Sequence, residues 1–346
     1  MTHFLVSLII FFSNSIRAQQ CSTLPTLRKF MPKYAKNFQI EYKENFKIVS
    51  TLSEHYLVAK DLKKIKCDYK FKLKQVENNV VMTSTTYLPV LSLLQKQNTL
   101  VAFQGKKYIY DSHFDLSKIT DIGFTLNPEN LLGYKPQLIL AYPENLQNIN
   151  DLAFYYRMSL PLVLSYEHLE NTALGRAEWV VFNAAFFGEE EKGIKFFNEI
   201  EQNYILLSKS KKVKRKVLIG DVQNGFWVFP GASSDFSKIV QDAGAELILN
   251  VSSNKTQRIS LEEFISKKIK PDLWLLNNNV QKLKELDHPI YKDLKNIPIY
   301  NYVNRVNRNG ANDFWETSIS RPDLVLKDML NILTGRDNEL TWYKRI

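Results

Sequence analysis

The chain has 346 residues, 45% of them hydrophobic and 24% charged, which is enough for two domains with their own cores and excludes a largely disordered protein. Its 46 basic and 36 acidic residues give a net charge of +10, but the basic residues are spread out or mixed with acids, so we expect no nucleic-acid binding. No GxxxxGK[ST], GxGxxG or GxSxG motif occurs, and the histidines show no HxxxH or HExxH spacing, so we expect no catalytic residues, cofactor or protein-bound metal.

The first 18 residues have the pattern of a cleavable signal peptide. Residues 4–12 form an apolar core that is too short to span a bilayer, which takes roughly 20 residues, and Ala18 suits the cleavage site. We therefore expect a periplasmic protein. A lipid anchor at Cys21 is the alternative, although two glutamines stand where a lipobox has a small residue. In an oxidising compartment Cys21 and Cys67 can pair; otherwise one is free and the other is a buried thiol.

A first lobe is predicted over residues 38–165, after an N-terminal extension at 19–37. Polar and apolar residues alternate over 38–60, which predicts a β-hairpin or meander. From residue 80 onward, short apolar runs alternate with helical segments, and this predicts a parallel α/β sheet. The strands predicted for this sheet are 80–82, 100–103, 138–142 and 160–164.

A bridge and a second lobe follow. Apolar residues at helical spacing over about 170–208 predict a long rigid helix within a bridge at 166–210. The strand–helix alternation resumes in a C-terminal lobe at 211–335, which ends in a helix at 322–334 and leaves a tail at 336–346. The strands predicted for this lobe are 217–220, 247–249, 271–276 and 299–302.

The two lobes show an internal correspondence. In each lobe a capped helix with an early glutamate, Glu129 or Glu262, precedes a Lys-Pro turn and a buried strand. The fold class predicted is therefore α/β, with two Rossmann-like lobes joined by a long rigid helix. A ligand cleft is expected between the lobes.

Several segments, in a fixed order, carry a family resemblance. They are 84–89 (STTYLP), 127–129 (NPE), 175–179 (GRAEW), 243–245 (AGA), 312–316 (NDFWE) and 321–328 (RPDLVLKD). With them, residues about 38–335 resemble the solute-binding proteins of ABC importers for iron–siderophores and vitamin B12, the helical-backbone class. The resemblance implies a monomer that is not an enzyme. It would capture a small-molecule metal chelate, an iron–siderophore, for an ABC permease and ATPase. The alternatives are an exported two-lobed α/β enzyme and a tetrapyrrole- or corrinoid-handling protein.

Aromatic and arginine residues near the predicted cleft are the candidate ligand-binding residues. Aromatic rings stack on planar chelates, and arginine suits the oxygens of anionic siderophores. The candidates are Tyr87, Tyr108, Tyr166, Arg176, Trp227, Arg305 and Trp315. The alternatives are packing in the core or in loops for the aromatics, and an ion pair with Glu170 or Glu178 for Arg176. We interpret residues 166–168 as a polar surface turn.

Glu129 and Glu262 are the candidate permease-docking residues. The resemblance implies one such glutamate in each lobe, and these two occupy matching positions. The alternative is that each simply complements the positive end of its own helix.

Overall fold

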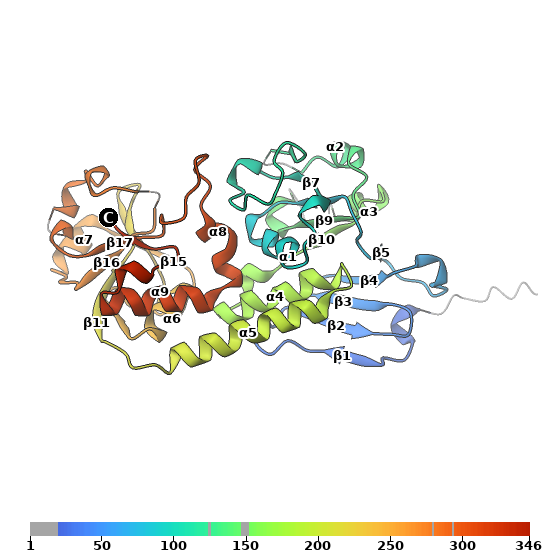
Figure 1. The fold of residues 1–346 in the computed structure, drawn as a ribbon, viewed down its shortest axis with the longest axis horizontal. Helices are drawn as coiled ribbons and strands as arrows, with labels where there is room; N and C mark the ends of the chain where they lie inside the picture. The colour runs from blue at the N-terminus through green and yellow to red at the C-terminus, as the bar shows by residue number, and fades with distance from the viewer. Residues whose placement is uncertain (1–19, 124–125, 147–151, 279, 293) are drawn as a thin grey trace, which may run out of the picture.

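The structure, a computed structural model, describes residues 20–123, 126–146, 152–278, 280–292 and 294–346. The predicted signal peptide at 1–18 lies outside these residues. Two lobes lie side by side, with helices α4 (Ala173–Ala185) and α5 (Glu190–Ser208) running beneath them (Figure 1). In the described part of the chain, none of the helices combines the length and the apolar character needed to cross a membrane.

The N-terminal lobe is built on the predicted parallel sheet. Its strands lie in the order β10-β9-β6-β7-β8, and each neighbouring pair is parallel. Their bounds are β6 (Val80–Met82), β7 (Leu100–Phe103), β8 (Thr120–Asp121), β9 (Leu138–Ala141) and β10 (Leu162–Leu164). The connecting helices are α1 (Leu88–Leu93), α2 (Pro128–Gly133) and α3 (Leu152–Arg157). Strands β6, β9 and β10 are buried along their length, as expected where both faces of a sheet are covered.

The C-terminal lobe repeats this arrangement. Its sheet has the order β14-β11-β16-β17-β18, with only the β17–β18 pair antiparallel among these. The strands are β11 (Arg215–Ile219), β14 (Ala245–Leu247), β16 (Leu273–Leu275), β17 (Ile299–Asn301) and β18 (Lys344–Arg345). The helices are α6 (Asp235–Asp242), α7 (Leu261–Ser266), α8 (Asp313–Thr317) and α9 (Pro322–Thr334). Strand β18 and the buried Trp342 and Tyr343 make the expected tail part of this lobe.

A second, antiparallel sheet lies in the C-terminal lobe and was not predicted. It has the order β12-β13-β15, with β12 (Asp221–Gln223), β13 (Phe226–Pro230) and β15 (Thr256–Ser260). Asn224 and Gly225, both with positive φ, form the turn between β12 and β13. An Asn-Gly pair favours such tight hairpins, so this turn was a signal available in the sequence.

An N-terminal sheet lies below the first lobe, beside α4 and α5 (Figure 1). It has the order β1-β2-β3-β4-β5. Its strands are β1 (Arg28–Phe30), β2 (Phe38–Tyr42), β3 (Lys47–Thr51), β4 (His55–Ala59) and β5 (Lys72–Lys74). The predicted meander is present as β2, β3 and β4. The expected boundary at residue 38, however, separates strands β1 and β2, which pair with each other.

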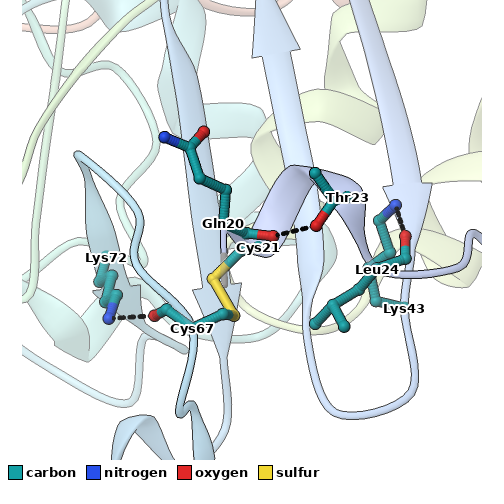
Figure 2. The surroundings of a disulfide bond; sticks show 7 residues. All are labelled: Gln20, Cys21, Thr23, Leu24, Lys43, Cys67 and Lys72. Atoms are coloured by element: carbon teal, nitrogen blue, oxygen red, sulfur yellow. Dashed lines mark hydrogen bonds between the residues drawn. A yellow bond between two sulfur atoms is a disulfide. The ribbon is translucent and has the colours of Figure 1, made fainter. Parts of the chain in front are cut away.

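A disulfide bond joins two segments that pack against one face of this sheet (Figure 2). Cys21 and Cys67 are bonded across 46 residues of sequence, and both lie in an apolar cluster with Phe46, Ile48 and Leu57. In the structure the two cysteines are therefore paired with each other, and neither is a free thiol. A sulfur in a disulfide has no free valence for a lipid thioether, so this pairing and a lipid anchor at Cys21 exclude each other.

The bridge consists of two helices and not of one. Helix α4 ends before Gly188, which has a φ of 70° and so occupies the left-handed region. A Cβ atom there would lie 2.4 Å from the end of the Gln75 side chain, and the positive φ itself favours glycine at this position. The chain reverses here, and α5 packs along α4 and α9.

Candidate functional site

A cavity lies at the carboxyl ends of the C-terminal lobe's parallel strands, where ligands bind in open α/β sheets. It has a volume of about 200 Å³ and contacts the ends of β11, β16 and β17, the first residues of α4 and α6, and helices α8 and α9. Its aromatic lining is Phe236, Tyr302, Phe314, Trp315 and Tyr343. Ligand pockets usually measure ~300–1,000 Å³, so a whole chelate needs side chains at the rim to move. Trp315, 47% exposed, is at that rim.

Arg176, on the second turn of α4, ties the two lobes together at the floor of the cleft. Its Nε donates to Glu167 Oε2 of the first lobe at 2.8 Å, and its Nη1 donates to Asp235 Oδ2 of the second lobe at 2.7 Å. Burial alone would lower the pKa of the guanidinium, but the two carboxylates outweigh burial and raise the pKa above its ordinary value. Arg176 is therefore a permanently charged group held between two acids.

Glu167 is a buried carboxylate and not part of a surface turn, so that interpretation of residues 166–168 is wrong for this residue. It follows strand β10 closely, and it accepts hydrogen bonds from the hydroxyls of Tyr142 and Thr86 as well as from Arg176. Tyr142 and Thr86 also follow strands of the same sheet. The first lobe thus presents a connected polar cluster at the carboxyl edge of its sheet.

Glu170 and Glu178 were the alternative ion-pair partners expected for Arg176, but they bind backbone N–H groups instead. Glu178 accepts the backbone N–H groups of residues 33–35, and Glu170 accepts those of residues 36 and 37. These two carboxylates therefore attach the loop between β1 and β2 to helix α4.

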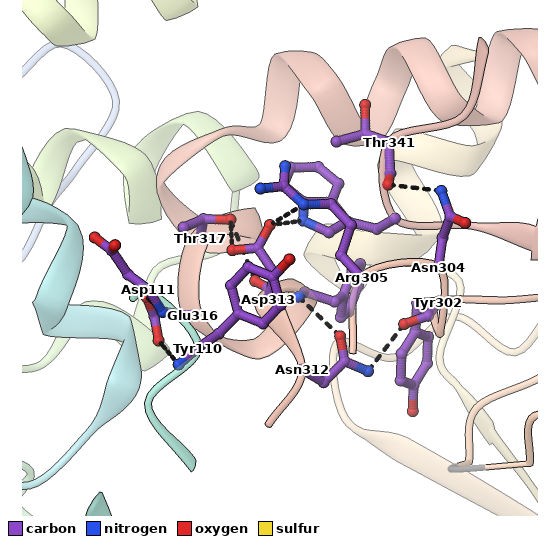
Figure 3. Close-up of polar contacts among 12 residues, drawn as sticks. Tyr110, Asp111, Tyr302, Asn304, Arg305, Asn312, Asp313, Glu316, Thr317 and Thr341 are labelled. Atoms are coloured by element: carbon purple, nitrogen blue, oxygen red, sulfur yellow. Dashed lines mark hydrogen bonds and ion pairs between the residues drawn. The ribbon is translucent and has the colours of Figure 1, made fainter. Parts of the chain in front are cut away.

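Helix α8 of the second lobe reaches across to the first lobe (Figure 3). The Glu316 carboxylate accepts the backbone N–H of Tyr110 at 2.6 Å and that of Asp111 at 3.1 Å. The Thr85 hydroxyl donates to the Trp315 carbonyl at 3.0 Å. Burial raises the pKa of Glu316 to about 7, although the two N–H donors oppose this shift. Glu316 is therefore a second tie between the lobes.

Arg305 lies beside Asp313 of helix α8 and near Tyr110 of the first lobe (Figure 3). Its Nε is 3.1 Å from Asp313 Oδ2, and its guanidinium lies over the ring of Tyr110. Asp313 also accepts the indole N–H of Trp342. Arg305 is thus engaged with neighbouring side chains and lines a separate hollow between the lobes.

The other predicted aromatics do not line the cavity. Trp227 is fully buried in strand β13, stacks on Phe264 and donates its indole N–H to the Ile219 carbonyl, so its prediction as a ligand contact is wrong for this structure. Tyr87 is buried in the core of the first lobe. Tyr166 points to the N-terminal sheet, where its hydroxyl bonds Ser53. Tyr108 is exposed, with Lys107 over its ring.

Among the predicted ligand-binding residues, the structure therefore brings Arg176 and Trp315 to the cavity. Sequence reasoning missed Glu167, Asp235 and Tyr302. Each lies near a recognisable element: Glu167 follows the strand predicted at 160–164, Tyr302 ends the strand predicted at 299–302, and Asp235 begins helix α6 after its Ser234 cap. The sequence does not show that these three residues lie close together, because their distances depend on how the two lobes are placed relative to each other.

Glu129 and Glu262 occupy the predicted positions. Each is exposed in the first turn of a six-residue helix, α2 or α7, whose first backbone donors are capped by Asn127 or Ser260. Within the described residues, no group of three or more His, Cys, Asp and Glu side chains is placed to hold a metal ion.

Comparisons with known proteins agree with this architecture. A family model described as "Periplasmic binding protein" matches residues 80–303. An uncharacterised lipoprotein of Methanocaldococcus jannaschii is 25% identical over 366 residues, which cover 93% of this chain and 86% of the relative. The N-terminal sheet precedes the residues matched by the family model.

Solved structures share the fold. The triscatecholate siderophore binding protein FeuA of Bacillus subtilis aligns over 78% of this chain and 96% of its own, with a TM-score of 0.55 and 18% identity. The periplasmic heme binding protein HutB of Vibrio cholerae aligns over 74% of this chain and 98% of its own, with a TM-score of 0.54 and 17% identity. These neighbours are binding proteins and not enzymes. The chain therefore belongs to the periplasmic binding protein family and has its two-lobed α/β fold.

Proposed function

We propose that the chain is the solute-binding component of an ABC importer, and that it captures a metal chelate of the iron–siderophore class. The observation that carries this proposal is the cavity at the carboxyl ends of β11, β16 and β17, lined by aromatic rings and closed at its floor by the interlobe Arg176. Rings such as Tyr302 and Trp315 supply flat, apolar contact area for a chelate. Fold neighbours that bind a siderophore or heme support this class of ligand.

We propose that the protein works in the periplasm as a soluble monomer. The signal-like N-terminus and the Cys21–Cys67 disulfide both favour an oxidising compartment. The partners would be an ABC permease and its ATPase at the inner membrane. Exposed Glu129 and Glu262, one in each lobe, would contact the permease.

Capture is tested on protein purified from cells grown with limiting iron. Mass spectrometry of released small molecules and elemental analysis are expected to show about one chelated iron per chain. A ligand present at a hundred times its Kd should also raise the free energy of unfolding by roughly 2.7 kcal/mol. Turnover of the ligand into a product by the purified protein would instead support the alternative of an exported enzyme.

Docking is tested by charge reversal. The double variant Glu129→Lys/Glu262→Lys should abolish uptake while chelate affinity stays unchanged, and each single variant should reduce uptake partly, because one anchor remains. The control is Glu199→Lys/Glu246→Lys, which reverses two exposed glutamates on α5 and β14. If uptake survives the double reversal, helix-end charge complementarity is the better account of both residues.

A further inference from the structure

The charged side chains at the cavity floor limit the charge of the ligands that the cavity can hold. Among the described residues that line the cavity, the charged side chains are Arg176 and Asp235. Arg176 is also bonded to the buried Glu167, so two carboxylates surround one guanidinium. Its Nε and Nη1 donors are thus directed at protein carboxylates, and the described cavity lining holds no cation in excess of acid.

Three other basic side chains near the cleft are also engaged. Arg305 pairs with Asp313 behind α8, and Lys106 donates to the carbonyls of Leu116 and Ile119. Lys238, on α6, donates to the carbonyl of Asn171. The chain has a net charge of +10, yet this charge is not concentrated at the cavity.

We infer that the cleft selects a neutral or cationic metal chelate and discriminates against highly anionic ones; this inference rests on the proposed function. Ferric chelates differ in charge by simple arithmetic. Three hydroxamates, each a monoanion, neutralise Fe³⁺, whereas three catecholates, each a dianion, leave three negative charges. A trianion at this floor would meet Asp235, with Glu167 buried close by, while Arg176, the cation of the described lining, is already paired with both. A neutral trihydroxamate meets walls that are mainly aromatic and aliphatic, with the polar Asn277 and Ser318, and a floor in which Arg176 and Asp235 balance.

The experiment compares two ferric chelates on the purified protein by equilibrium dialysis with iron as the readout. The probes are ferrioxamine B, a cationic trihydroxamate, and ferri-bacillibactin, a triscatecholate. We expect ferrioxamine B to bind at least about tenfold more tightly, because each unit of like charge near 7 Å costs roughly tenfold in affinity at intermediate screening.

A charge variant separates electrostatics from chelate shape. Asp235→Asn removes one carboxylate from the cavity and frees one face of Arg176, so the preference for ferrioxamine B should fall about tenfold or more. Glu167→Gln should act in the same direction from the other lobe. Asp242→Asn removes the same charge at the far end of α6 and should leave the preference unchanged. Melting curves for each variant check that the fold is intact.

The outcomes are distinguishable. Tighter binding of ferri-bacillibactin, or a preference that Asp235→Asn leaves unchanged, overturns the inference but leaves chelate capture standing. Binding of neither siderophore overturns the proposed function and the inference together. A preference for ferrioxamine B that collapses in Asp235→Asn and persists in Asp242→Asn supports both.

Discussion

Two tryptophans that look alike in the sequence occupy opposite environments. Trp227 is fully buried between Phe264 and Trp274, whereas Trp315 is 47% exposed at the cavity rim. Trp227→Ala should therefore lower the free energy of unfolding by about 3–5 kcal/mol, as expected for a buried aromatic. Trp315→Ala should cost less than about 1 kcal/mol and should weaken ferrioxamine binding several-fold. Urea unfolding and dialysis on both variants provide the measurements.

The conservative variant Trp227→Phe sharpens this test. It keeps an aromatic ring in the core and loses the hydrogen bond to the Ile219 carbonyl. Chelate affinity should match that of the unchanged protein. A clear loss of affinity in Trp227→Phe without a loss of stability would show that Trp227 contacts the ligand, contrary to its position in the core.

Single residues were harder to predict than the elements that carry them. Trp227 lies beyond the strand predicted at 217–220, which suggests a loop at the cleft, but the Asn224-Gly225 turn folds it back into a second sheet. Arg176 was predicted at the cleft from a motif, yet its partners come from 9 and 59 residues away in sequence. Pairings between lobes depend on tertiary geometry, and a local pattern does not contain it.

At the scale of elements, apolar runs were a reliable signal. Four of the five strands in each lobe's main sheet were predicted to within a few residues, because strands buried on both faces are apolar along their length. The short edge strands β8 and β18 were missed. The N-terminal sheet was predicted only in part. Its edge strands β1 and β5 are three residues long and rich in lysine and arginine, a composition typical of exposed loops as well as of edges.

The N-terminal sheet is attached to α5 by a buried ion pair. Lys47 Nζ lies 2.6 Å from Glu190 Oε2, and each side chain is 10% exposed. Burial lowers the pKa of Lys47, and Glu190 opposes that shift. Lys47→Met should lower the free energy of unfolding by about 3–5 kcal/mol, because it leaves the Glu190 carboxylate buried without its ion-pair partner. Chemical denaturation measures this loss.

A second substitution and a control complete this test. Lys47→Met/Glu190→Leu should recover most of the lost stability, since neither charge then remains buried. Lys192→Met, on the same helix, removes the exposed ion-pair partner of Glu189. It should lower the free energy of unfolding by less than about 1 kcal/mol. Equal losses for the buried and the exposed pair would show that the sheet does not depend on this contact.

At the scale of the whole molecule, Glu316 should couple stability to pH. Its pKa rises from 4.5 to about 7 on folding, so the folded protein holds a proton that the unfolded chain releases in this range. The free energy of unfolding should therefore fall by up to about 3 kcal/mol as pH rises from 4.5 to 7. The nearby carboxylates of Asp111 and Asp313 contribute to this rise in the pKa of Glu316.

Denaturation across this pH range measures the coupling. Glu316→Gln should flatten the fall, because its side chain does not titrate, and Glu199→Gln on the exposed face of α5 should not. A pH profile that is the same in Glu316→Gln and in the unchanged protein would assign the dependence to other carboxyls.

The lobes should move little when a chelate binds. Helices α4 and α5 pack along each other, α5 packs on α9 of the second lobe, and the N-terminal sheet holds α4 through Glu178. Arg176 and Glu316 then join the lobes at two separate points. Admission of a chelate therefore requires a local shift at the rim near Trp315. Small-angle scattering with and without ferrioxamine B should give the same radius of gyration within error. Glu316→Ala, which removes one of the two ties, should make any change larger. A marked compaction of the unchanged protein on binding would show that the bridge bends, contrary to a pair of packed helices acting as a rigid support.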